Sequence, residues 1–112
     1  MAKFERQMRV RAAALASYLD DGIRQSGMSV ELVDTSSYRM GNFSVFLYVY
    51  DKYYMRNSSR AALSVQIIGD EDGSYVTAIG AGGGNGSFFS FSYGAEENFV
   101  SVVERLLDEY NE

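Results

Sequence analysis

Two segments of the chain repeat apolar residues with the period of an α-helix. In both segments these residues fall at offsets 0, 3, 4, 7 and 11, which places them along one side of a helix. They are Ala12, Leu15, Ala16, Leu19 and Ile23 in the first segment, and Phe99, Val102, Val103, Leu106 and Tyr110 in the second. Gly27 is predicted to end the first helix, and Ser92 or Gly94 to cap the second.

Between the two predicted helices the apolar residues alternate with a period of two, which indicates β-strands. The alternating segments are residues 28–32, 43–50, 61–68, 75–79 and 89–93, and residues 1–8 are a further candidate. Turn residues separate them at 41–42, 57–59 and 70–73. These connections are short, so neighbouring strands are expected to pair antiparallel.

The predicted order of elements is therefore β-α-β-β-β-β-β-α. It describes a single α+β domain over residues 1–112. We expect a two-layer sandwich, with a mainly antiparallel sheet of five to six strands and two helices on one face.

The strand segment FSVFLYVYDKYY carries apolar or aromatic residues at both its odd-numbered and its even-numbered positions. We expect Phe43, Val45, Leu47 and Val49 to face the helices, which places the aromatic residues between them on the opposite face. An uncovered sheet face is usually polar, so an aromatic one predicts an interface or a ligand groove. The residues of this predicted face are Phe46, Tyr48, Tyr50, Tyr54 and Ile68.

Three interpretations of that face remain open at this point. The face could pair with a second copy in a homodimer, because tyrosine rings bury well while their hydroxyls stay hydrogen-bonded. It could instead curl into a pocket for a small apolar or aromatic ligand. The tyrosines could also be strand-forming residues whose hydroxyls are in water.

The stretch GAGGGNGSFFSFSYG at residues 80–94 resembles a phosphate-binding loop only in composition. None of its glycines satisfies the G-x-G-x-x-G spacing, and no lysine follows Lys52 to complete a P-loop. We expect a hairpin loop formed by Gly82, Gly83, Gly84, Asn85 and Gly86. The alternative is a strand without side chains, where another backbone or a ligand approaches closely.

Composition removes several classes of chemistry. The 112 residues include no histidine and no cysteine, so a Ser-His-Asp triad, a thiolate nucleophile and the usual zinc sites are excluded. Carboxylates could still bind magnesium or calcium. However, the acidic segment at 70–73 lacks the calcium-loop template and is expected to be a solvated turn. We predict no catalytic residue, cofactor or metal.

Charge is divided unevenly along the chain. Residues 1–60 hold nine Lys and Arg and six Asp and Glu (+3), whereas residues 61–112 hold one and nine (−8), giving −5 in total. Nucleic acid is not an expected partner for a chain of this charge. No apolar run is long enough for a membrane span, and no signal peptide is recognisable, so a cytoplasmic location is predicted.

The opening strand and helix, the segments FSVFLYVYDKYY and ALSVQIIGDEDGSYVTAIGAGGG, and the acidic closing helix resemble a family of small bacterial proteins of unknown function, found mainly in Gram-positive bacteria. That resemblance implies an uncharacterised cytoplasmic α+β protein and supplies no catalytic residues. We predict a non-enzymatic interaction domain that forms a homo-oligomer, most simply a dimer, through the aromatic face. The alternative is a small-ligand binder that uses the same face and the glycine-rich loop.

Overall fold

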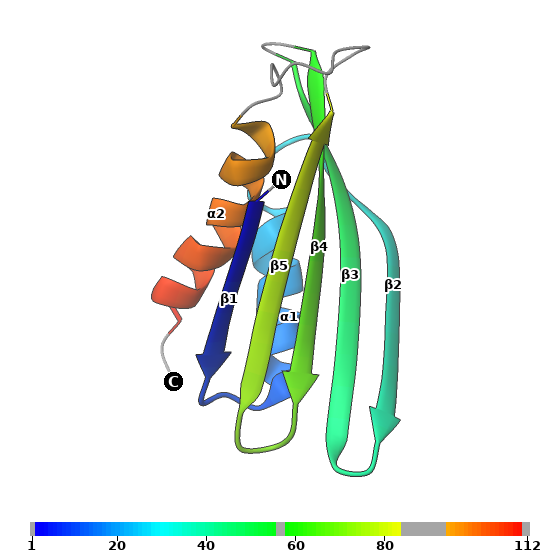
Figure 1. The fold of residues 1–112 in the computed structure, drawn as a ribbon, viewed down its shortest axis with the longest axis vertical. Helices are drawn as coiled ribbons and strands as arrows, with labels where there is room; N and C mark the ends of the chain where they lie inside the picture. The colour runs from blue at the N-terminus through cyan, green and yellow to red at the C-terminus, as the bar shows by residue number, and fades with distance from the viewer. Residues whose placement is uncertain (1, 56–57, 84–93, 111–112) are drawn as a thin grey trace.

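One antiparallel sheet and two helices make up the part of the chain that the computed structural model describes, residues 2–55, 58–83 and 94–110 (Figure 1). The sheet has the strand order β1-β5-β4-β3-β2. The α+β class and the order of elements match the prediction, and the predicted strand at 89–93 lies outside the described residues. The elements are β1 (Ala2–Met8), α1 (Ala12–Arg24), β2 (Val30–Met40), β3 (Phe43–Tyr54), β4 (Ser59–Gly69), β5 (Ser74–Gly83) and α2 (Ala95–Asp108).

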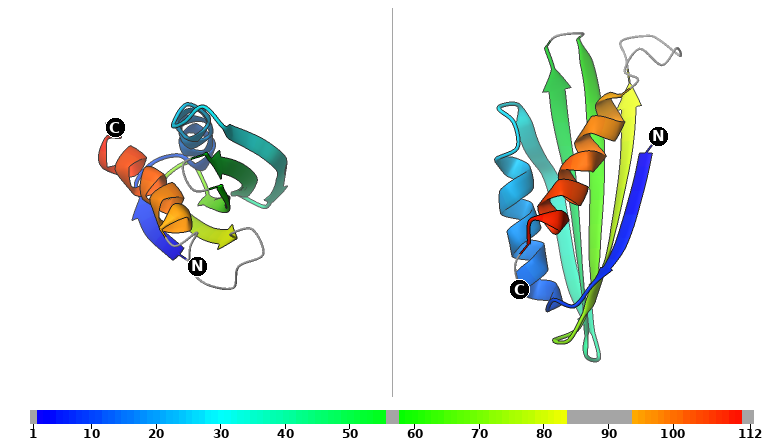
Figure 2. Two further views of the ribbon diagram at one scale, coloured as in Figure 1. Left: turned by 90° about the horizontal axis from the view of Figure 1, so that it is seen from above. Right: turned by 90° about the vertical axis from the view of Figure 1, so that its left-hand side faces the viewer.

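Both helices pack on the same face of the sheet (Figure 2). Strands β2 to β5 follow one another as antiparallel neighbours, and β1 returns to pair with β5. Among the described strands, β1 and β2 are consequently the two at the edges of the sheet. Neither of the two described helices lies on the opposite face of the sheet (Figures 1 and 2), and we call it the open face.

The helices begin and end close to the predicted positions. The backbone N–H of Ala12 donates to the carbonyl of Asp70 at 3.0 Å, which fixes the start of α1 at the β4–β5 turn. This helix ends at Arg24, three residues before Gly27, because the N–H groups of Gln25 and Ser26 already close its last turn. Gly94 caps α2 in the left-handed conformation with φ of 95°, as glycine readily does.

The core lies between the helices and one face of β3, β4 and β5. Leu63, Val65, Ile67 and Val76 are fully buried there. Gly80 lets α2 approach β5 closely, because a Cβ on Gly80 would lie 2.7 Å from Val100 Cγ2 and 2.8 Å from the Glu96 carbonyl oxygen. The first glycine of the glycine-rich stretch therefore serves helix–sheet packing.

The rest of the glycine-rich stretch is only partly described. Gly82 and Gly83 extend β5 and pair with Ala61 and Arg60, so they lie in a strand and not in the predicted loop. Gly84, Asn85 and Gly86 lie outside the described residues.

Candidate functional site

The aromatic residues of β3 face the helices, so the predicted orientation of this strand is wrong. Tyr50 is fully buried, and Phe46, Tyr48 and Tyr54 pack against the core. Ile68 pairs with Val45 and therefore lies on the open face, away from these four. The structure does not bring the five predicted site residues together on one surface.

Hydrogen-bond acceptors on the helices explain why tyrosines occupy the core side. The Tyr50 hydroxyl donates to Asp20 Oδ1 at 2.6 Å, and the Tyr54 hydroxyl donates to the carbonyl of Ala95 at 3.3 Å. A buried tyrosine is tolerated when its hydroxyl has such a partner. Burial, followed by the bond to Asp20, raises the pKa of Tyr50 far above its ordinary value, which keeps the hydroxyl protonated.

Asp20 is the centre of this polar cluster on α1. Arg24 donates to it twice, from Nε to Oδ1 at 3.0 Å and from Nη2 to Oδ2 at 2.8 Å. Both carboxylate oxygens are thus engaged by protein donors. We interpret the cluster of Asp20, Arg24 and Tyr50 as a structural tie between α1 and β3, since no free oxygen points to a substrate.

Lys52 is the other charged group on the helix side of β3. Its Nζ lies 4.8 Å from the centre of the Tyr54 ring and 5.9 Å from that of Phe99. Burial lowers the pKa of this amine. The two aromatic faces compensate part of the lost hydration through cation–π attraction, so the lysine also has a packing role.

The open face carries three rows of side chains that cross all five strands in register. The first, or tyrosine row, contains Gln7, Tyr75, Ile68, Val45 and Tyr38; the second, or middle row, contains Glu5, Thr77, Gln66, Leu47 and Ser36. The third, or charged row, contains Lys3, Ile79, Ser64, Val49 and Asp34.

Several aromatic and aliphatic side chains on these rows are exposed to solvent, whereas Val45 between them is buried. The exposed fractions are 57% for Tyr38, 41% for Tyr75, 39% for Ile79 and 38% for Leu47. Phe43, at 52%, continues the patch toward the β2–β3 turn. Because an uncovered antiparallel face is normally polar, this patch is the strongest candidate for an interaction surface.

A shallow hollow of about 160 Å³ interrupts the open face at β2 and β3. It is lined by Asp34, Thr35, Ser36, Leu47 and Val49. Of the open-face residues the sequence interpretation named only Ile68, because it assigned Val45, Leu47 and Val49 to the core. The signal that could have found them is the parity of pairing between β3 and β4, in which Tyr50 lies opposite Leu63.

The acidic side chains of the described part of the chain do not gather into a metal-binding cluster. Residues 2–55, 58–83 and 94–110 contain no group of three or more Asp or Glu placed to hold a metal ion. Asp70 Oδ1 accepts the backbone N–H groups of Asp72 and Gly73 at 2.9 and 3.1 Å, so the acidic segment forms a local turn. Neither α1 nor α2 is long and apolar enough to cross a membrane.

Comparisons with known proteins place the chain in a family. The model of a family described as "Family of unknown function (DUF6054)" matches residues 1–111. No curated protein matches the chain. Among solved structures, the crystal structure of TTHA0849 from Thermus thermophilus is 13% identical, covers 98% of this chain and 99% of its own, and has a TM-score of 0.38. The family match spans nearly the whole sequence, and the chain therefore belongs to this family of unknown function.

Proposed function

We propose that the protein is an interaction domain that self-associates through its open face. The observation that carries the proposal is the charged row, which reads Lys3, Ile79, Ser64, Val49, Asp34 across the sheet. This row has a cation at one end, an anion at the other and aliphatic residues on both sides of a central serine. Such a row is complementary to its own reversed copy.

A two-fold axis parallel to the strands and close to β4 would bring two copies together in that way. The axis reverses each row, so Lys3 meets the partner's Asp34 and Ile79 meets the partner's Val49. Ile79 is then opposite the hollow that Leu47 and Val49 line. A closed dimer with an isologous interface is the commonest arrangement of identical chains.

Electrostatics favours this axis over the other two-fold arrangement. An axis perpendicular to the strands, through the middle row, would place Glu5 opposite the partner's Glu5. Like charges that face each other across an interface oppose association, whereas opposite charges set orientation. The parallel axis places Glu5 opposite the partner's Ser36 and forms the two Lys3–Asp34 pairs.

The area of the open face is sufficient for a stable interface. Five strands at about 4.8 Å spacing give a width of about 24 Å, and the run from Phe43 to Asp51 is about 27 Å long. The two facing surfaces together then cover about 1,300 Å², which falls in the range of stable protein interfaces. Sheets in a sandwich pack about 10 Å apart, so the helices would remain outside the dimer.

Two arginine substitutions test the proposal. Leu47→Arg and Ile79→Arg each place a charge at the centre of the proposed interface, on side chains that are already partly exposed. We expect sedimentation analysis over a concentration series to show a dimer for the natural chain and a monomer for both variants. Val33→Arg is the matched control, because Val33 is an exposed aliphatic residue at the bulge of edge strand β2 (62% exposed).

The outcome that contradicts self-association is equally direct. A natural chain that remains monomeric at millimolar concentration would show that the open face does not pair with its own copy. Dissociation by Val33→Arg together with retained association in Leu47→Arg would move the interface from the open face to the β2 edge.

The ligand-binding alternative has weaker support. It requires Phe46, Tyr48, Tyr50 and Tyr54 to line a site, yet Tyr50 is fully buried and its hydroxyl is bonded to Asp20. Native mass spectrometry of freshly purified protein tests it, because a retained small molecule would add mass to each chain. Retained mass that survives Leu47→Arg would favour the ligand-binding function over the dimer.

A further inference from the structure

The outer edge of β1 and the helix α2 form a groove of about 330 Å³. Within the described ranges β1 pairs only with β5, so alternate N–H and C=O groups of β1 point away from the sheet. The C-terminal half of α2 extends beyond this edge (Figure 1). A strand added to β1 would therefore lie beside the helix.

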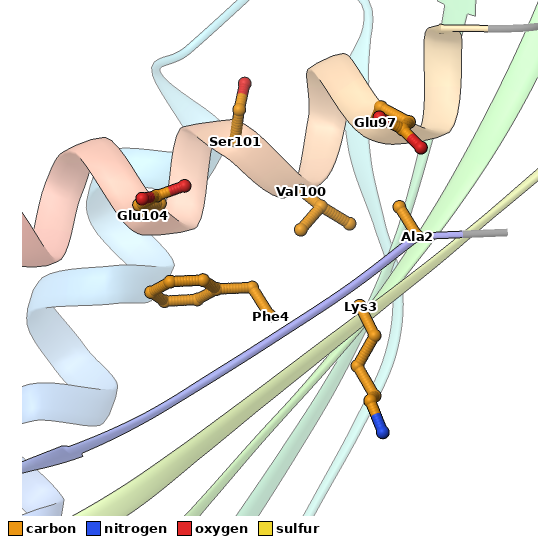
Figure 3. A pocket seen from close by; sticks show the side chains of 7 residues that line it. All are labelled: Ala2, Lys3, Phe4, Glu97, Val100, Ser101 and Glu104. Atoms are coloured by element: carbon orange, nitrogen blue, oxygen red, sulfur yellow. The ribbon is translucent and has the colours of Figure 1, made fainter.

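The walls of the groove differ in chemistry. Phe4 from β1 and Val100 from α2 form its apolar part, and Figure 3 shows the Phe4 ring between the strand and the helix. Glu97, Ser101 and Glu104 form a polar wall, because residues four and three apart share one side of a helix. The groove thus combines an apolar floor with two carboxylates about two helical turns apart.

Arg6 shows how a cation is bound at one end of the groove. Its guanidinium carbon lies 5.0 Å from the centre of the Phe4 ring, and its Nη1 lies 2.8 Å from Asp108 Oδ1. Asp108 continues the line of Glu97, Ser101 and Glu104 along α2 at the next helical spacing. No described cation forms an ion pair with Glu97 or Glu104.

We propose that this groove binds an extended segment of a partner protein that carries Arg or Lys at alternate positions. The backbone of the segment would pair with the free edge of β1 and add a strand to the sheet. Its cationic side chains would lie over Phe4 and reach Glu97 and Glu104, as Arg6 reaches Asp108. The apolar side chains between them would point to the other face of the sheet.

Charge complementarity selects a basic partner. Residues 61–112, which include all of α2, carry a net charge of −8. Alternate side chains of a strand are about 6.8 Å apart, and Glu97 and Glu104 are about 10.5 Å apart along the helix axis, a mismatch that flexible Arg and Lys side chains can span. The carboxylates of the groove lie on the helix side of the sheet, and Lys3 is the one residue that lines the groove and also belongs to the charged row of the open face.

A labelled peptide of alternating Arg and Val, blocked at both ends, is the probe. We expect it to bind the full chain in a fluorescence anisotropy titration and to slow amide exchange of β1. The Glu97→Lys/Glu104→Lys variant is expected to weaken binding about tenfold or more, because two charge-assisted contacts become repulsive. The matched control is Glu71→Lys/Asp72→Lys in the β4–β5 turn, which changes the net charge equally and should alter affinity less than about threefold.

A second peptide separates strand addition from attraction between charges alone. It has the same sequence with methyl groups on alternate backbone nitrogens, which keeps the charges and removes the N–H donors. Strand addition requires this peptide to bind at least tenfold more weakly. Equal binding of the two peptides, equal loss in the groove and turn variants, or unchanged exchange of β1 amides would each overturn the proposal.

Discussion

The two faces of the sheet use the same strand in opposite ways. On the helix side, β3 presents Tyr50 to a fully buried core and hydrogen-bonds its hydroxyl to Asp20. On the open side, the same strand presents Leu47, which stays 38% exposed. On β3 the side that carries the tyrosine hydroxyls Tyr50 and Tyr54 is the covered one, because the helices supply hydrogen-bond acceptors that solvent would otherwise supply.

This difference shows that the identity of side chains does not decide which face of an alternating strand is covered. Aliphatic residues are the conventional core formers, yet a tyrosine face packs equally well where a carboxylate and a carbonyl accept hydrogen bonds from the hydroxyl groups. The aliphatic side of β3 is then left without a helix to cover it. Substitutions that alter side chains on one face and leave the other face intact can therefore test the two faces separately.

The largest effect is expected from matched leucine truncations on the two faces. Leu63→Ala removes a fully buried side chain on the helix side and should lower the free energy of unfolding by about 2–5 kcal/mol. Leu47→Ala removes a partly exposed one and should cost the monomer about 0.5 kcal/mol or less. Urea unfolding at low protein concentration measures both.

Repeating the unfolding measurements of Leu63→Ala and Leu47→Ala at several protein concentrations tests whether a second copy covers the open face. If the open face is covered by a second copy, the cost of Leu47→Ala rises with concentration while that of Leu63→Ala stays constant. Equal costs for the two truncations at low concentration would show that the two faces do not differ in burial as described.

A smaller effect is expected from removal of one hydroxyl on the helix side. Tyr50→Phe keeps the ring and breaks the bond to Asp20, which should lower the free energy of unfolding by about 1–3 kcal/mol. Tyr38→Phe is the control on the open face, where the side chain is 57% exposed and the change should be near zero. Thermal unfolding of both variants beside the natural chain provides the comparison.

The pH dependence of the same variant follows from the raised pKa of Tyr50. The folded state holds the phenol neutral above its ordinary pKa of 10.0, because burial and then Asp20 disfavour the phenolate. The contribution of the neutral Tyr50 phenol to folding stability is therefore complete below about pH 10 and is lost as the pH rises beyond that value. Between pH 9 and pH 11 the natural chain should lose more stability than Tyr50→Phe, and parallel curves would contradict the proposed environment.

The order of elements was predictable because each depends on a local period. These periods do not depend on which face of the sheet is covered. They are the helical offsets in residues 12–23 and 99–110 and the alternation in residues 43–50. The orientation of β3 depends instead on pairing parity, which the β3–β4 connection sets. Tyr54 pairs with Ser59, and a connection with one residue more or fewer would place Ile68 on the same side as Tyr48.

The rows of the open face depend on the other registers as well. Its rows join residues from five strands that are far apart in sequence, so Lys3 and Asp34 share a row only after every register is fixed. A bulge between Leu32 and Asp34 shifts the last of these registers by one residue. Asp34 keeps the register that the β2–β3 turn sets at Met40 and Phe43, and the bulge shifts only residues 30–32 relative to β3.

The smallest expected effect concerns the two ends of the charged row. Lys3→Asp places two acidic residues opposite each other at both ends of the proposed interface, and Asp34→Lys places two basic residues there. Each exposed ion pair contributes about 0.2–1 kcal/mol, and a dimer contains two, so each single variant should raise the dissociation constant about twofold to thirtyfold. Sedimentation velocity at low salt measures the change.

The double variant distinguishes a defined pair from a general effect of charge. Lys3→Asp/Asp34→Lys restores opposite charges across the parallel two-fold axis and leaves the net charge of the natural chain unchanged. Its dissociation constant should return to within about threefold of the natural value, while high salt should reduce all the differences. If the loss of dimerisation free energy in the double variant equals the sum of the losses in the two single variants, Lys3 does not face the partner's Asp34. The parallel axis would then be wrong even if Leu47→Arg dissociates the dimer, because that substitution tests the face and the charge exchange tests its orientation.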